Sequence, residues 1–466
     1  MRKLLKRLLC CLGCALLLIP IGAVSEKPLF QDAYVHDPSV LRVGDWYYIY
    51  GSHMAAAKSL DLMTWQMIST NAKDGCTLVQ NVQTQMQEAL TWAKTDTFWA
   101  SGIAKLRKGP YCLYYCACEG SSPLSAMGLA VSDNPEGPFE NKGIFLKSGM
   151  RGLGENGTPY DATIEPNVID AEVFYDAQGN LWMVYGSYSG GIFILRMDEK
   201  TGLPVPGQGY GKKLLGRNHS RIEGPYVLYS PETEYYYLFL SFGGLDASGG
   251  YNIRVARSKM PDGPYLDAQG QDMMNCGGPD GSFFDDAAIE PYGVKLLGGF
   301  RFMPIEGVEA LPEQAYKSPG HNSAFYDETS GRYFLIFHTR FSALGDEFRD
   351  RVHEFWMSEE GWPLVSPLRY AGPGEEPESG LDGRWRLLEH EKDINRYQHR
   401  SREVMFEING TITGAAEGNW TEKSITLNGK SYTGCFSIGW DAERKQWVRT
   451  LTMLSEDGEA LWGIQG

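Results

Sequence analysis

Four ionisable residues stand at the start of similar strand–turn–strand segments: Asp37, Asp170, Glu223 and His321. Carboxyl and imidazole groups are the side chains that most often donate and accept protons in enzymes, provided that they reach a common substrate. In the sequence these four residues lie far apart. Acid–base chemistry at these positions therefore requires a fold that brings the starts of several strands to one place.

Residues 164–195 show the repeated segment in its simplest form. Asp170 stands first, an apolar stretch follows at 173–175, and a turn at 176–180 leads into a second apolar stretch at 181–185. The turn contains Asp, Gly and Asn, which tolerate the backbone angles of turns, and the second stretch is apolar at every position, as in a strand buried on both faces. The pattern predicts a β-hairpin with a polar residue at its head.

The same plan begins again at Asp37, Ser101, Glu223 and His321, which gives five units in all. The second unit, in the sequence FWASGI, has no ionisable group at its head. Successive heads lie roughly 50–100 residues apart, which suits propeller blades of about 40–50 residues with loop insertions. The sequence thus predicts an all-β fold, a five-bladed β-propeller, whose central channel brings Asp37, Asp170, Glu223 and His321 together.

Composition and charge agree with such a fold and limit the partners. Aromatic residues make up 12% of the 466 residues, and 55 glycines and 24 prolines favour short strands joined by many turns over a helical bundle. The formal net charge is −15 at pH 7. A strongly acidic protein repels polyanions, so we expect no nucleic-acid partner and a neutral or small-molecule substrate.

Residues 1–25 have the pattern of a secretory signal peptide. Basic residues come first, a continuous apolar stretch follows at 8–23, and small residues at 23–25 offer a cleavage site. We expect a mature chain that begins near Glu26, an extracellular location and no membrane contact after cleavage. An uncleaved anchor is disfavoured because the apolar stretch is shorter than the roughly 20 residues of a spanning helix. Lipid attachment at Cys14 is a weaker alternative.

The remaining chain divides into two predicted domains. The propeller occupies residues 26–371, and a linker rich in Pro, Gly and Glu follows at 372–383. Residues 384–466 alternate short strands with Asn-Gly and Asp-Gly turns, which predicts a small β-sandwich or barrel. The insertion before the fifth unit, at 260–316, is expected to contain an extra hairpin at 293–303.

Two clusters outside the hairpin heads contain metal-ligand residue types but are interpreted as structural. Asp280, Asp285 and Asp286 lack the spacing of a helix–loop–helix calcium site, so a plain acidic loop is favoured. The three cysteines within 112–118 share one face of a predicted strand, and no second cluster accompanies them. Core packing is therefore favoured over zinc binding, and a disulfide stays open.

Five motifs along the chain resemble those of glycoside hydrolase family 43, most closely its endo-arabinanases that carry a small C-terminal β domain. The motifs are HDPS around Asp37, NVIDAE around Asp170, GSYSGGI after it, HNSRIEGPY around Glu223 and GHNS around His321. They follow one another in the expected order across residues 30–370. Residues 98–103 read FWASGI where many relatives have FWAPDI, so no acidic substrate contact is assigned there.

The resemblance implies hydrolysis of internal α-1,5-L-arabinofuranosidic bonds of arabinan with inversion. Asp37 would be the general base that activates water, and Glu223 the general acid; in inverting enzymes such groups lie roughly 6.5–9.5 Å apart. Asp170 would be a third carboxylate that raises the pKa of Glu223 and orients it. A calcium ion would be held in the channel by His321 and largely by water, and would add positive field near the base.

The resemblance also implies where the substrate is bound. Besides the three carboxylates, contacts are expected from a group of polar residues beside them: Asn167, Ser187, Tyr188, Ser189 and His219. The expected partner is arabinan or an arabino-oligosaccharide, and the protein is expected to be a monomer.

Other functions fit part of the same pattern. An exo-acting α-L-arabinofuranosidase or β-xylosidase of the same family would share the three carboxylates and differ in having a closed pocket. A non-catalytic glycan-binding propeller would need neither an acid nor a base, so the three carboxylates weigh against it. A sialidase-like propeller would need an arginine cluster for the substrate carboxylate, and none of the five heads is an arginine.

Overall fold

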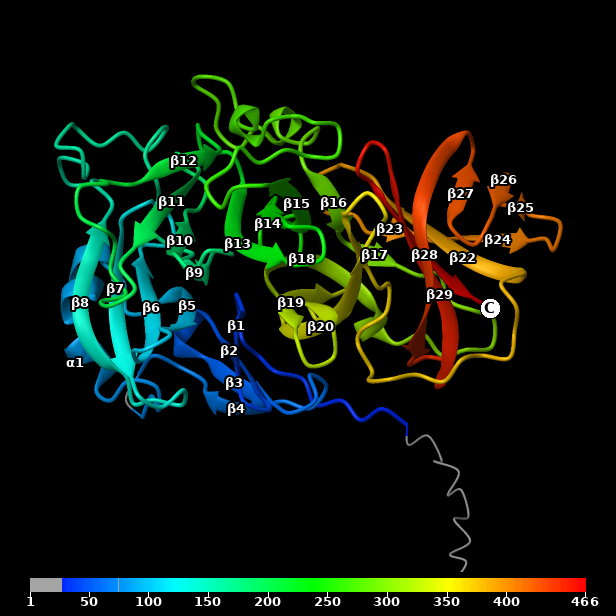
Figure 1. Ribbon diagram of the computed structural model, residues 1–466, viewed down its shortest axis with the longest axis horizontal. Helices are drawn as coiled ribbons and strands as arrows, with labels where there is room; N and C mark the ends of the chain where they lie inside the picture. The colour runs from blue at the N-terminus through cyan, green and yellow to red at the C-terminus, as the bar shows by residue number, and fades with distance from the viewer. Residues whose placement is uncertain (1–26, 74) are drawn as a thin grey trace, which may run out of the picture.

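The computed structural model describes residues 27–73 and 75–466, which form a five-bladed β-propeller and a closed eight-stranded β-barrel (Figure 1). Strands contain 45% of the residues and helices 5%. The predicted all-β propeller is confirmed, and of the two forms predicted for the C-terminal domain the barrel is the one observed. The predicted signal peptide lies outside the described residues.

Each of the first four blades is an antiparallel sheet of four consecutive strands. The first blade contains β1 (Ser39–Val43), β2 (Trp46–Tyr50), β3 (Ala56–Ser59) and β4 (Gln66–Ser69). The second contains β5 (Trp99–Lys105), β6 (Tyr111–Cys118), β7 (Ser125–Ser132) and β8 (Glu140–Lys147). The third contains β9 (Glu172–Tyr175), β10 (Leu181–Tyr185), β11 (Ile192–Met197) and β12 (Lys212–Leu215). The fourth contains β13 (Ile222–Ser230), β14 (Tyr235–Phe242), β15 (Asn252–Ser258) and β16 (Val294–Leu297).

The fifth blade is larger. Its main strands are β18 (Ala315–Asp327), β19 (Arg332–Phe341), β20 (Phe348–Met357) and β21 (Pro363–Val365), extended by β17 (Phe300–Arg301) and β23 (His399–Arg400). The hairpin predicted at 293–303 is wrong, because β16 pairs with β15 and β17 pairs with β18. The chain passes from the fourth blade to the fifth between β16 and β17, and each of these short strands pairs with a strand of its own blade.

Helices are few and short. Between the first two blades lie α1 (Val82–Gln85) and α2 (Gln87–Ala93), and single 3₁₀ turns occur at η1 (Ser52–Met54), η2 (Met273–Asn275), η3 (Asp286–Ala288) and η4 (Pro312–Gln314). Within 27–73 and 75–466, no helix is long and apolar enough to span a membrane.

The C-terminal barrel is closed by pairing of its first and last strands. Its strands are β22 (Gly383–His390), β24 (Arg402–Phe406), β25 (Thr411–Gly414), β26 (Gly418–Trp420), β27 (Ser424–Leu427), β28 (Lys430–Asp441), β29 (Gln446–Ser455) and β30 (Ala460–Gln465). Buried side chains such as Trp385, Phe406 and Leu451 fill the interior, so the barrel has a packed core.

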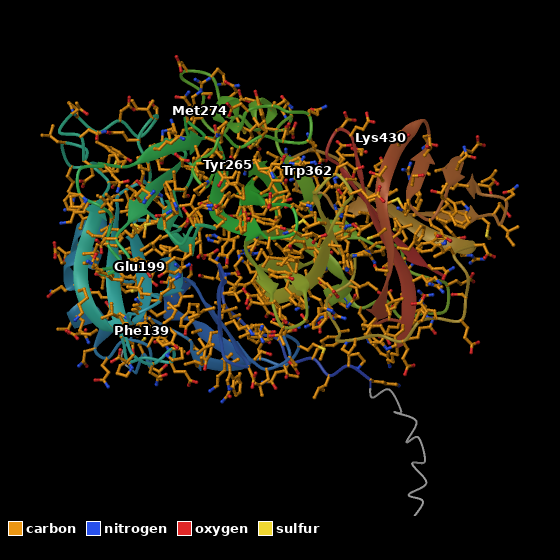
Figure 2. All side chains as sticks on the ribbon, viewed as in Figure 1. Phe139, Glu199, Tyr265, Met274, Trp362 and Lys430 are labelled. Atoms are coloured by element: carbon orange, nitrogen blue, oxygen red, sulfur yellow. The ribbon has the colours of Figure 1, made fainter. Side chains whose placement is uncertain are left out.

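Propeller and barrel share one hydrophobic core. Trp362 of the fifth blade and Trp462 of the barrel belong to the same buried cluster, and Figure 2 shows Trp362 where the two domains meet. Phe300 packs edge-to-face on Trp462 with ring centroids 5.1 Å apart. Since this contact is apolar and buried, the barrel stabilises the fifth blade.

The three cysteines within 112–118 lie where core packing was predicted. Cys112, Cys116 and Cys118 are buried as free thiols in one cluster between the second and third blades. Burial raises the pKa of Cys112 to about 11, so the thiol stays protonated. The core interpretation is confirmed.

Charge pairs close the ring between the first and fifth blades. Asp32 lies 3.1 Å from Arg351, 2.9 Å from Arg369 and 3.6 Å from Arg349. The backbone N–H of Val35 donates to a carboxylate oxygen of Asp350 over 2.8 Å. These contacts fix the segment that leads to Asp37 against the last blade.

We expect Asp32→Ala to lower the free energy of unfolding by about 3–5 kcal/mol, because it leaves the buried guanidinium of Arg351 without a counter-charge. Chemical denaturation followed by tryptophan fluorescence measures this loss. The control is Lys423→Ala, which breaks the exposed pair with Glu359 and should change stability by at most about 1 kcal/mol. Equal effects of the two substitutions would contradict a closing role for Asp32.

Candidate active site

The hairpin heads meet in the channel because the backbone turns sharply at each of them. Asp37 precedes β1, Asp170 precedes β9 and His321 lies within β18, and all three have positive φ values of 62°, 61° and 46°. Non-glycine residues rarely adopt this left-handed conformation, which is costly and is typical of functional sites. The strain indicates that packing of the blades holds these side chains in place.

Glu223 is placed by a different device. It lies near the start of β13, and the pairing with β14 shifts register between Glu223 and Tyr226. Such a bulge re-aims a side chain beside an active site. In β18 of the fifth blade, a Cβ at Gly320 would lie 2.0 Å from the ring of Tyr251, so only glycine lets this tyrosine, which binds Glu223, approach.

One cavity of about 530 Å³ gathers every residue that the sequence predicted for the site. Four are the ionisable heads and five are the expected substrate contacts: Asp37, Asp170, Glu223, His321, Asn167, Ser187, Tyr188, Ser189 and His219. A cavity of this size accommodates a few sugar rings. The roles of the individual residues follow from their environments.

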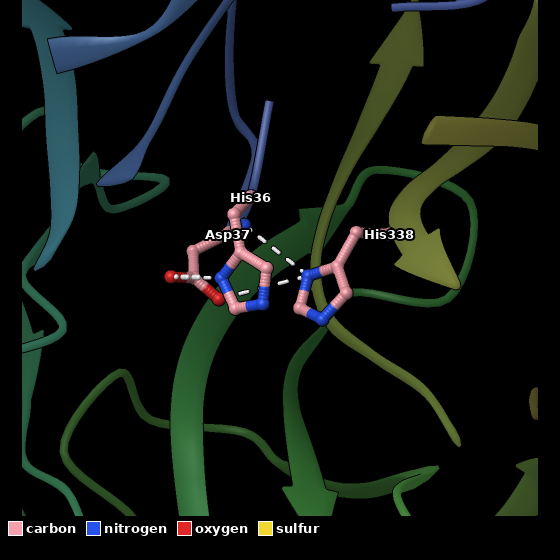
Figure 3. A group of neighbouring side chains, drawn as sticks. All are labelled: His36, Asp37 and His338. Carbon is pink, nitrogen blue, oxygen red and sulfur yellow. Dashed lines mark hydrogen bonds and ion pairs between the residues drawn. The ribbon is translucent and has the colours of Figure 1, made fainter. Parts of the chain in front are cut away.

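Asp37 is buried among the imidazoles of His36, His321 and His338, and Figure 3 shows the first and the last of these. Its carboxylate lies 2.8 Å from Nδ1 of His36 and 3.0 Å from Nδ1 of His321, and the hydroxyl of Ser52 donates to it. Burial alone would raise the pKa of Asp37, but His321 and His36 outweigh burial and hold the pKa well below its ordinary value. Asp37 is therefore ionised at neutral pH and able to accept a proton.

His338 keeps the backbone of Asp37 in position. Its Nδ1 accepts the backbone N–H of Asp37 over 3.2 Å, which requires an unprotonated Nδ1 (Figure 3). Burial lowers the pKa of His338 well below its ordinary value, in agreement with a neutral ring. His338 is thus a neutral support for Asp37.

Glu223 has the opposite environment. The hydroxyl of Ser187 donates to its Oε2 over 2.6 Å, and the hydroxyl of Tyr251 donates to its Oε1. Burial raises the pKa of Glu223; these two hydrogen bonds oppose the rise, and the charge of Asp37 adds to it. The net pKa lies above the ordinary value, as a general acid requires.

Asp170 lies beside Glu223 and accepts the backbone N–H of Gly224 over 3.1 Å. Burial raises the pKa of Asp170 to about 8, with contributions from the charges of Glu223 and Asp37 that His321 partly offsets. Asp170 and Glu223 therefore titrate as a pair, which keeps one proton through neutral pH.

His321 is the cation of the cavity. Burial would lower its pKa, but the charges of Asp37 and Asp170 raise the pKa to about 10. At neutral pH the protonated ring compensates the buried negative charge of Asp37, which would otherwise be very unfavourable.

The remaining predicted contacts line the cavity around these groups. Asn167 lies 3.8 Å from the thiol of Cys118, and the hydroxyl of Tyr188 donates to the carbonyl of Gly243 over 2.9 Å. The backbone N–H of His219 donates to the carbonyl of Ser189 over 2.9 Å. Polar side chains thus line the cavity around the carboxylates.

Sequence reasoning missed several residues of the site. Ser52 and Tyr251 donate to carboxylates, and His338 accepts the backbone N–H of Asp37. None of the three stands at the head of a hairpin, and nothing in the local pattern marks them. Phe283 and Phe284 line the cavity from the acidic loop. Of the missed residues, only this adjacent pair of phenylalanines in a polar loop could have been recognised from the sequence.

The acidic loop itself uses its carboxylates locally. Asp286 pairs with Arg221, and Asp285 caps η3 by accepting the backbone N–H of Ala288. Among the described residues, the groups with metal-ligand geometry are His36, Asp37 and His338 in the channel, and Glu391, Asp393 and His399 near the barrel.

The channel donors fit calcium only as a hydrated ion. Calcium takes six to eight oxygen ligands, whereas the cluster of His36, Asp37 and His338 offers one carboxylate and imidazole nitrogens. Nδ1 of His321 faces Asp37, which leaves Nε2 as the nitrogen for a further ligand. A calcium ion here would keep most of its shell as water.

Fold and site together define a β-propeller with three buried carboxyl groups in its central channel. A family model described as glycosyl hydrolases family 43 matches residues 26–286, and a model described as a C-terminal lipocalin-like domain matches residues 367–463. The extracellular endo-α-(1→5)-L-arabinanase 2 of Bacillus subtilis is 53% identical over 452 residues, which cover 96% of both chains.

Similarity to solved structures indicates the same family. The chain is similar to a family 43 glycoside hydrolase from Bacillus licheniformis, with a TM-score of 0.90 and 54% identity over 94% of this chain and 99% of that one. It is also similar to the endo-1,5-α-L-arabinanase of Thermotoga petrophila, with a TM-score of 0.89 and 45% identity over 94% and 100%. The chain belongs to family 43 of the glycosyl hydrolases.

We expect Asp170→Asn to move the alkaline limb of the pH–activity profile toward acid. The substitution removes a group that shares negative charge with Glu223, so Glu223 loses its proton at lower pH. Initial rates from pH 4 to 10 on wild type and variant locate the limb, with the exposed Glu199→Gln as control. An unmoved limb, or one moved toward alkali, would show that Asp170 only holds the substrate.

Proposed function

We propose that the protein is an extracellular endo-α-1,5-L-arabinanase that cleaves arabinan with inversion. The observation that carries the proposal is the asymmetry of the buried carboxyl groups. Asp37 has a pKa well below its ordinary value beside His321, whereas Glu223 has a raised pKa in the same cavity. Carboxyl groups whose environments push their pKa values apart are assigned as base and acid.

Asp37 acts as the general base. Its ionised carboxylate takes a proton from a water molecule, which attacks the anomeric carbon on the face opposite the leaving group. His321 and Ser52 hold the carboxylate through its two oxygens, so the group is oriented before water binds. Glu223 protonates the glycosidic oxygen as the bond breaks, and the pair with Asp170 supplies the protonated state at neutral pH.

The substrate and the location are supported by the relatives. Two proteins that match over more than nine-tenths of their length, from Bacillus subtilis and Thermotoga petrophila, carry names that specify extracellular endo-α-(1→5)-L-arabinanases. The polar residues of the cavity suit a neutral polysaccharide, and the acidic chain disfavours a polyanionic one. The apolar leader at 8–23 supports export.

Incubation with linear α-1,5-arabinan and separation of the products by size over time tests the proposal. Endo action yields a spread of intermediate oligosaccharides early in the reaction. Arabinose as the sole product would assign an exo-acting enzyme, and bound but uncleaved arabinan would assign a glycan-binding propeller. Proton NMR of the first-formed anomer distinguishes inversion from retention.

We expect Asp37→Asn and Glu223→Gln each to reduce kcat about 10²–10⁴-fold, the usual contribution of one acid–base step. Both substitutions keep the size of the side chain, so the melting temperature should change little. The control is Asp133→Asn on the exposed surface. Activity within a few-fold of wild type in either active-site variant would overturn the assignment.

We further propose that the channel binds a calcium ion through Nε2 of His321 and water. When bound, the ion supplies positive charge near the carboxylate of Asp37. Because His321 is protonated in the free protein, binding should release up to one proton, so the calorimetric enthalpy should depend on the ionisation enthalpy of the buffer.

Chelation should depress activity far more than the melting temperature, since the proposed ion clamps no loop. Calcium titration of the chelated protein should give a binding isotherm that His321→Gln abolishes. A melting temperature that falls by many degrees on chelation would place a structural ion elsewhere, first at Asp280, Asp285 and Asp286.

A further inference from the structure

Two exposed phenylalanines stand at the edge of the catalytic cavity. Phe283 is 66% exposed and Phe284 is 44% exposed, and their rings stack with centroids 4.2 Å apart at an interplanar angle of 28°. Both line the cavity that contains Glu223 and Asp37. Large apolar side chains gathered in the open commonly mark a binding surface.

The loop that carries the pair is fixed against the segment that precedes the general acid. Asp286 accepts a hydrogen bond from Nε of Arg221 over 2.9 Å, and the backbone N–H of Gly278 donates to the hydroxyl of Ser220 over 2.8 Å. Asn218 donates to the carbonyl of Gly278 over 2.9 Å. The loop is thus anchored at both ends to residues two to five positions before Glu223.

The phenylalanines are also held in an unfavourable state. Phe284 has a φ of 56°, a left-handed conformation that is an outlier for a bulky residue. Its ring packs edge-on to Tyr188 at 5.5 Å, and the ring of Phe283 lies 5.0 Å from His219. Strained backbone and exposed rings are both unfavourable in the free protein, and together they point to a ligand that covers the rings.

We propose that Phe283 and Phe284 form an aromatic platform on which a furanose ring of the arabinan chain stacks, on the leaving-group side of the scissile bond. The proposal rests on the function proposed above. A sugar ring presents C–H bonds on one face, which suit an apolar aromatic surface, while its hydroxyl groups stay at the polar rim. We assign the platform to the leaving-group side because Glu223 protonates the leaving oxygen and directly follows the segment that anchors the platform.

Such a platform would make a specificity-determining contact away from the reacting atoms. Binding energy from a remote sugar positions the scissile bond between Asp37 and Glu223, so that polymer and long oligosaccharides are cleaved faster than short ones. The contact would thereby favour cleavage within the chain.

Kinetics on linear arabinan tests the platform. We expect Phe283→Ala and Phe284→Ala each to lower kcat/KM about tenfold, because each removes part of the aromatic surface that the bound sugar would cover. The effect on arabinotriose should be smaller, because a short substrate gains less from a remote contact. Phe283→Trp and Phe284→Tyr should retain activity. The matched control is Tyr397→Ala, which removes an aromatic ring that is 67% exposed and lies outside the cavity.

A binding measurement separates stacking from altered catalysis. In the inactive Glu223→Gln background, calorimetric titration with arabinohexaose should show about tenfold weaker binding after either alanine substitution. With reducing-end-labelled arabinohexaose and active enzyme, the preferred cleavage site should move toward the reducing end, since fewer sugars are held on the leaving-group side.

Activity on arabinan and the effect of the alanine substitutions test the function and the platform separately. If wild type does not cleave arabinan, the function is wrong. If wild type cleaves it and the alanine variants match Tyr397→Ala in kinetics and affinity, the platform is wrong. A cleavage site that moves away from the reducing end would overturn the assignment to the leaving-group side.

Discussion

Burial of three carboxyl groups in one channel is the constraint on which the site depends. Asp37, Asp170 and Glu223 are all buried, and a buried charge without compensation is very unfavourable. The imidazolium of His321 lies against Asp37 and not midway between the three. This placement makes Asp37 the ionised group and leaves Asp170 and Glu223 to hold a proton. The proposed division into base and acid therefore rests on where one positive charge is located.

The propeller creates that arrangement at a cost in backbone strain. Asp37, Asp170 and His321 adopt left-handed backbone angles that an isolated hairpin would avoid. Close packing of the blades, the charge pairs around Asp32 and the core shared with the barrel supply the stability that keeps them there. The barrel, although it provides no cavity residue, thus supports the blade that carries His321.

Loop insertions extend this rigid scaffold around the cavity. The insertion between β15 and β16 holds Phe283 and Phe284 at the cavity edge, and its aspartates serve as anchors and caps. Such loops can change without disturbing the blade cores, whereas a change at a head would alter the charge balance of the channel.

The sequence by itself determined the five hairpins, the propeller and the four ionisable heads, because strand patterns and turn residues are local signals. Only the tertiary structure decided that β16 and β17 belong to different blades and that the tail closes as a barrel. It alone also decided that His338 contacts Asp37 and that Tyr251 contacts Glu223. Residues that blade packing brings together cannot be recognised from the local sequence, because they lie far apart along the chain. Burial and the nearest charges set the pKa of a carboxyl group, so the proposed division between base and acid also depends on the tertiary structure.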